Sequence, residues 1–115
     1  MTIFTTAALV LALLSPPYKP LMSSRAAAEE GRAEAKTDIA AGRLILRTYG
    51  ISPAAESPYT RLLAERLGVK VVVVAACTPD ARTITETAAY NEVMKREIRK
   101  RFGRNALEDI ERETR

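Results

Sequence analysis

The sequence predicts a small α/β domain in which two parallel strands are joined by a short helix and packed by an N-terminal helix and a long C-terminal helix. Two runs have the composition of strands, at residues 43–50 and 71–76. Between them, residues 57–68 carry the start and stop signals of a helix. Strand, helix and strand in this order form a βαβ unit, which is a two-stranded parallel sheet with a helical crossover.

Residues 1–23 are predicted to be a leader and linker, and residues 24–115 the single domain. As a helix, the apolar run from Ile3 to Leu14 would span roughly 18 Å, against roughly 30 Å of bilayer hydrocarbon. Its length is typical of a secretory signal or signal-anchor, and a proline-rich break follows it. We therefore expect an exported or membrane-anchored protein that meets the membrane only through this segment. The alternative is a buried N-terminus on a cytoplasmic protein.

The first helix of the domain is predicted to begin at Ser24 and to stop at Gly42. Its apolar face is mostly alanine, with Ile39 as the only large residue, so a neighbouring element can approach closely. Gly31 costs this helix about 1 kcal/mol relative to alanine, unless close packing requires the missing side chain.

The βαβ unit contains the most apolar stretch of the domain. Ser57 is a cap for its helix, Pro58 suits the first helical position, and Gly68 ends it. The second strand is apolar at every position from 71 to 76, a pattern typical of a parallel strand covered on both faces. We expect Cys77 to be the buried end of this strand. The exposed edges of so small a sheet also favour a homodimer.

A long helix is predicted from Thr78 to Gly103, and a short one follows to the C-terminus. Asn91 falls within its apolar stripe and needs a partner if buried, either a strand-end carbonyl or an equivalent residue across a dimer. The stripe consists of Ile84, Ala88, Met94, Ile98 and Phe102.

The chain contains no histidine and one cysteine. The lack of histidine excludes Ser-His-Asp and Cys-His nucleophiles and nearly all catalytic zinc or iron sites. A single cysteine cannot form an internal disulfide or a thiolate metal cage. The sequence thus predicts no cofactor and no metal, and it favours a protein that is not an enzyme.

One candidate ligand site lies at the carboxyl edge of the predicted sheet. Tyr49 and Gly50 end the first strand, and Cys77 and Thr78 follow the second. Ligands of open parallel sheets bind at this edge, where helix N-termini also favour anions. Because every βαβ unit has such an edge and no glycine-rich phosphate loop is present, a structural role for Cys77 is the favoured interpretation.

A second candidate is the basic end of the long helix, residues 95–104, which carries six basic residues and one acidic residue. Lys95, Arg99 and Arg101 are the candidate contacts to a polyanion. The alternative is internal pairing, with Glu92–Arg96 and Glu97–Arg101 at i, i+4 and the acidic last helix folded back. A net charge of +4, spread along the chain, gives no strong signal for nucleic acid.

Three segments carry a resemblance: "DIAAGRLILRTYG", "ERLGVKVVVVAAC" and "YNEVMKREIRKRFG". They resemble a group of uncharacterised short bacterial proteins with a hydrophobic N-terminal leader and a small α/β domain. The resemblance covers residues 30–103. Members often have glycine before the cysteine, where this chain has Ala76. The resemblance implies the domain limits and no catalytic residue.

The sequence therefore predicts a non-catalytic interaction or structural module. Two alternatives stay open. One is a small-anion or thiol site at the carboxyl edge of the sheet, which would allow an enzymatic activity, and the other is polyanion binding through residues 95–104.

Overall fold

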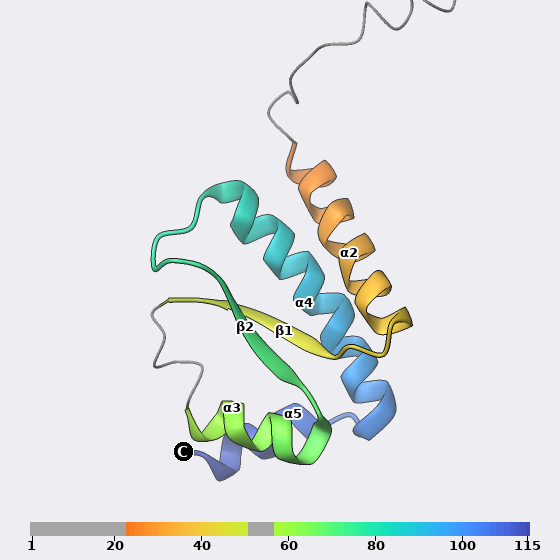
Figure 1. Ribbon diagram of the computed structural model, residues 1–115, viewed down its shortest axis with the longest axis vertical. Coiled ribbons are helices and arrows are strands. Elements are labelled where there is room, and N and C mark those ends of the chain that lie inside the picture. The colour runs from red at the N-terminus through yellow and green to blue at the C-terminus, as the bar shows by residue number, and fades with distance from the viewer. Residues whose placement is uncertain (1–22, 51–56) are drawn as a thin grey trace, which may run out of the picture.

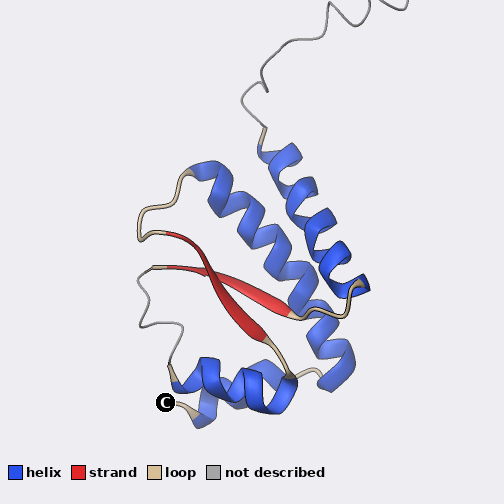
Figure 2. Cartoon of the chain, viewed as in Figure 1, coloured by secondary structure: helices blue, strands red, loops and turns tan. Residues whose placement is uncertain are grey.

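A computed structural model describes residues 23–50 and 57–115, and the predicted leader lies outside these residues. The described chain forms helices around a two-stranded parallel sheet, which confirms the predicted fold class. Figure 1 shows α2 (Ser24–Ala40) and α4 (Ala81–Phe102) side by side, with β1 (Ile45–Tyr49) next to α4 and β2 (Lys70–Ala75) paired with β1. Figure 2 shows the short helices gathered at one end of the sheet.

Helix α2 begins at Ser24, as predicted, and its cap is the preceding residue. Ser23 is the cap, and its hydroxyl accepts a hydrogen bond from the Ala26 N–H at 3.1 Å. Gly31 is buried where α2 meets α4, and a Cβ there would lie 2.2 Å from the Glu86 carbonyl oxygen. The missing side chain is therefore required by close packing of the two helices.

The strands pair in register from Ile45 opposite Lys70 to Thr48 opposite Val73, and an irregularity then places Tyr49 opposite Ala75. The crossover contains α3 (Pro58–Leu62), which continues into the π-helical segment η2 (Leu63–Leu67). As predicted, Ser57 caps α3, Pro58 takes its first turn, and Gly68 ends the segment in a left-handed conformation.

The prediction that the second strand is covered on both faces is wrong. Leu44 and Leu46 of the β1 segment are buried together with Val69, and Val71 packs against this core. Side chains alternate between the faces of a strand, so Lys70, Val72 and Val74 lie on the other face. No valine of β2 is buried, and Val74 is 39% exposed. An uninterrupted apolar run does not indicate which face of the strand is covered by the rest of the chain.

The buried face of helix α4 also differs from the predicted one. Met94 and Ile98 are fully buried as expected, whereas Ile84 and Phe102 are 47% and 43% exposed. Tyr90 is fully buried although it lies off the predicted stripe. The reason is that α4 packs against α2 as well as against β1, which turns its buried face toward the junction between them.

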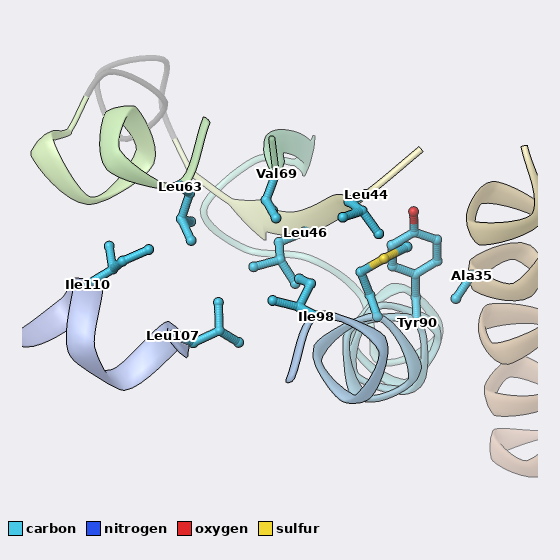
Figure 3. Packing of buried hydrophobic residues seen from close by; sticks show 10 residues of the cluster. Ala35, Leu44, Leu46, Leu63, Val69, Tyr90, Ile98, Leu107 and Ile110 are labelled. Carbon is cyan, nitrogen blue, oxygen red and sulfur yellow. The ribbon is translucent and has the colours of Figure 1, made fainter. Parts of the chain in front are cut away.

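The core continues from the sheet into the last helix, α5 (Ala106–Glu113), which follows Gly103. Figure 3 shows Leu107 and Ile110 of α5 directed toward Leu63 and toward Ile98 of α4. Arg99 of α4 pairs with Glu108 of α5 at 2.8 Å. The acidic helix is thus held against the basic end of α4, as the alternative interpretation of residues 95–104 expects.

Candidate functional site

The structure brings the predicted carboxyl-edge residues to one end of the sheet. Tyr49 pairs with Ala75, and the Gly50 N–H donates to the Ala75 carbonyl at 3.0 Å. Cys77 and Thr78 lie in the bend that follows β2, and both are exposed. The prediction of a buried Cys77 is wrong, because β2 ends at Ala75 and the chain turns outward before α4.

Two of the backbone donors at this edge are already used by the chain. Gly50 donates to Ala75, and the Thr83 N–H donates to the Asp80 carboxylate at 2.8 Å. Asp80, and not Thr78, caps α4, and this hydrogen bond lowers the pKa of its carboxyl. An incoming anion would meet a carboxylate at the N-terminus of α4. The anion and thiol site stays a prediction that these contacts do not favour.

The outer edge of β1 is closed by Asn91 of α4. Its side-chain NH₂ donates to the Arg47 carbonyl at 2.8 Å, and its carbonyl oxygen accepts from the Arg47 N–H at 2.9 Å. Both backbone groups of Arg47 point away from β2, where a third strand would otherwise bind. The predicted need of Asn91 for a partner is confirmed, with the partner in the middle of the strand.

The Arg47 side chain lies between α2 and α4. Its guanidinium is 2.8 Å from the Glu34 carboxylate and 3.8 Å from that of Glu86, and it stacks 3.7 Å from the centroid of the Tyr90 ring. It is only 20% exposed. An arginine packed on an aromatic ring and paired with carboxylates joins β1, α2 and α4.

A second polar contact ties Tyr90 to α2. The Tyr90 hydroxyl donates to the Asp38 carboxylate at 2.6 Å, and Arg43 binds the same carboxyl group at 2.9 Å. These hydrogen bonds lower the pKa of Asp38, whereas burial, followed by the bond to Asp38, raises the pKa of the Tyr90 hydroxyl. The sequence signal for this network was limited to Arg47, a charge within an apolar strand.

Three carboxylates, those of Glu30, Glu34 and Glu86, lie close enough for one oxygen of each to be within 4.8 Å of the others. Burial, with the neighbouring Glu34 and Glu30, raises the pKa of Glu86. Arg47 pairs with Glu34, and Arg82 lies 3.5 Å from Glu30. Two arginines therefore already supply the positive charge that a cation would bring.

A cavity of about 240 Å³ opens beside the covered face of the sheet. Its polar lining includes Ser57, which caps α3, and Asn91, which is bound to Arg47. Lys95 is the exposed cation of this lining. The cavity offers apolar surface more than a set of converging catalytic groups, and its other lining residues are Leu46, Arg47, Thr48, Tyr59, Thr60 and Val71.

Three of the six basic residues in 95–104 are paired with acidic groups. Arg101 lies 2.7 Å from Glu97, and Arg99 contacts Glu108 at 2.8 Å. Arg96 lies 3.2 Å from Glu92, so both predicted i, i+4 pairs are present. Of the three candidate polyanion contacts, Lys95 is the one for which the described residues show no ion pair. Polyanion binding stays a prediction.

The outer edge of β2, on the side away from β1, has no neighbouring strand within the described residues. The Lys70 N–H donates to the Leu44 carbonyl at 2.9 Å, so Lys70 directs its backbone groups toward β1. Backbone groups alternate along a strand, so those of Val71 and Val73 point outward. Within residues 23–50 and 57–115, β1 is the only strand beside β2. Among the described residues, the N–H and C=O groups of Val71 and Val73 therefore have no strand to pair with.

No family model, curated protein or solved structure matches the chain. The resemblance to short bacterial proteins stays a prediction. None of the helices in the described part of the chain has the length and apolar character needed to cross a membrane.

Proposed function

We propose that this chain is a non-catalytic interaction module whose contact surface is the outer edge of β2 together with Val72 and Val74. The observation that supports it most is the contrast in exposure along one small sheet. Leu44, Leu46 and Val69 are buried, whereas the first three valines of β2 are only partly buried and Val74 is exposed. An apolar strand with unpaired outward backbone groups is a ready template for strand addition.

The titratable groups of the α2–α4 junction support a non-catalytic role. Asp38 is held by Tyr90 and Arg43, and Glu34 by Arg47. Each carboxylate thus serves a contact between elements. Every buried side-chain nitrogen or oxygen of the described residues has a hydrogen-bond partner, as expected of a network that fixes structure.

The contact surface can be tested with a photoreactive amino acid at Val74, which is 39% exposed. The matched control carries it at Lys36, which is exposed on α2. We expect a discrete crosslinked product from position 74 and none from position 36 in cells that express the protein. The product should disappear when Val72→Lys is added. Equal labelling from both positions, or no product from either, would contradict the proposal.

We further propose that the module acts outside the cytoplasm or at a membrane. The run from Ile3 to Leu14 supports this through its composition, since its length is typical of an export signal. Cell fractionation of the full chain and of a chain lacking residues 1–22 tests it. Export or membrane association should be lost with these residues, and an unchanged distribution would refute this part of the proposal.

A further inference from the structure

We propose that the partner of the open β2 edge is a second copy of this chain, paired antiparallel about a two-fold axis that passes beside Val72. Two βαβ units would then share one four-stranded sheet. This inference rests on the proposed function, because it names the partner of the same surface.

The outward backbone groups determine the register. Val71 and Val73 are the two β2 residues whose N–H and C=O groups point away from β1. Ala75 is already bound to Gly50 through its carbonyl. An axis at Val72 places Val71 of each copy opposite Val73 of the other. All four outward N–H groups of the two copies then have an acceptor.

The side chains suit the same register. Lys70 is the only charged residue of β2, and antiparallel pairing places it opposite Val74 of the other copy. The aliphatic part of a lysine side chain can cover an exposed valine while its ammonium group stays in water. The two Lys70 residues would be about 14 Å apart along the sheet. Parallel pairing would instead set these like charges side by side, which is unfavourable.

The β1 edge explains why assembly would stop at two copies. Asn91 occupies the outward N–H and C=O groups of Arg47, and α4 lies along this edge. The shared sheet would therefore have a β1 strand, closed by its own helix, at each end. Such a pair is a closed two-fold dimer and not a growing sheet.

Sedimentation equilibrium of the full-length chain tests the dimer over roughly 1 µM to 1 mM. The wild type and Val72→Thr should reach twice the monomer mass. Val72→Lys places two lysines opposite each other at the axis and should weaken association at least tenfold. It leaves the covered face of the sheet unchanged, and circular dichroism should confirm its fold. Because every variant carries the same N-terminal residues, association through these would not distinguish the variants.

A second variant removes an outward donor directly. Val73→Pro lacks one edge N–H but leaves the hydrogen bonds between β1 and β2, so it should also be monomeric. If Val72→Lys and Val73→Pro both fold and both remain dimeric, the proposed interface is overturned.

The exposed Cys77 reports the direction of pairing. It is the only cysteine in the chain. Antiparallel pairing would place the two Ala75 residues about 20 Å apart along the sheet, so spin labels at Cys77, which follows Ala75, should be at least about 20 Å apart. Parallel pairing would place them about 5 Å apart and allow a disulfide between copies. A short distance would therefore overturn the antiparallel arrangement.

The outcomes separate this inference from the proposed function. If the chain stays monomeric at all concentrations and the amides of Val71 and Val73 exchange freely, only the second copy is refuted. If these amides are protected in a monomer, the edge is not open and both proposals fail.

Discussion

The outer edge of β1 is closed by a side chain of the same protein, whereas the outer edge of β2 has no partner within the described residues. Asn91 binds both outward groups of Arg47, and the Arg47 guanidinium adds contacts to Glu34 and Tyr90. Beside β2, the corresponding groups of Val71 and Val73 face outward and the valines are accessible. The difference shows which edge the described chain closes with its own side chain, and it is the basis for the contact surface proposed at β2.

The largest loss of stability should come from Asn91→Leu, which removes the side chain that binds the outer edge of β1. The change leaves the Arg47 N–H and C=O unpaired at a partly buried position, which should cost about 3 kcal/mol of unfolding free energy. Urea denaturation measures this loss.

The matched control is Asn105→Leu, at an exposed asparagine whose side chain makes no capping hydrogen bond. It should change stability by no more than about 0.5 kcal/mol. If both variants have the same small effect, Asn91 does not close the β1 edge.

The contact between α2 and α4 is tested by Gly31→Ala. Alanine would raise helix propensity by about 1 kcal/mol, but its Cβ would lie 2.2 Å from the Glu86 carbonyl oxygen. The helices must move apart, so we expect a net loss of about 2 kcal/mol in urea denaturation. Gly42→Ala meets no neighbouring atom and should lose only about 1 kcal/mol through its positive φ. A stability gain in Gly31→Ala would contradict the close packing.

Tyr90→Phe isolates the hydrogen bond to Asp38 and should cost about 1.5 kcal/mol at neutral pH. Because the folded-state pKa of Asp38 is lowered, its stabilising contribution is present above the unfolded pKa and is lost as pH falls through the folded pKa. The cost of Tyr90→Phe should therefore shrink in acid. Tyr59→Phe is the control, and its effect should be small at every pH. A cost that stays constant down to low pH would argue against the Asp38 bond.

The smallest change in stability should come from Glu86→Gln. The folded-state pKa of Glu86 is raised by burial and by its acidic neighbours, so its contribution to stability is present below the unfolded pKa and is lost as pH rises. The neutral glutamine should therefore stabilise the protein at pH 7, by less than about 1 kcal/mol, and make no difference in acid. Glu92→Gln, which loses an exposed pair with Arg96, should not show this gain. A clear loss of stability in Glu86→Gln would show that its contact with Arg47 outweighs the repulsion.

Helix ends were predictable because their signals are local. Ser57, Gly68 and Gly103 each end or cap an element through their own backbone preference, and all three do so in the structure. The βαβ order followed from the same signals. The alanine-rich face of α2 and Gly31 likewise indicated a close neighbour, which is α4.

Faces and partners were not predictable because they depend on the packing of distant segments. The continuous valines of β2 carry no alternation, so the sequence does not say which face stays open. Cys77 was placed in the core for the same reason. Tyr90 was missed because α4 turns toward α2, and the partner of Asn91 was expected at a strand end and found at Arg47.

Amide hydrogen exchange, resolved by NMR in dilute monomeric solution, tests the contrast between the two edges most directly. The Arg47 N–H, bound to Asn91, should exchange slowly, as should Val72, which faces β1. The Val71 and Val73 amides should exchange rapidly and become slower as protein concentration rises. If Val71 and Val73 are as protected as Arg47 in the monomer, the β2 edge is covered within the chain and the account is contradicted.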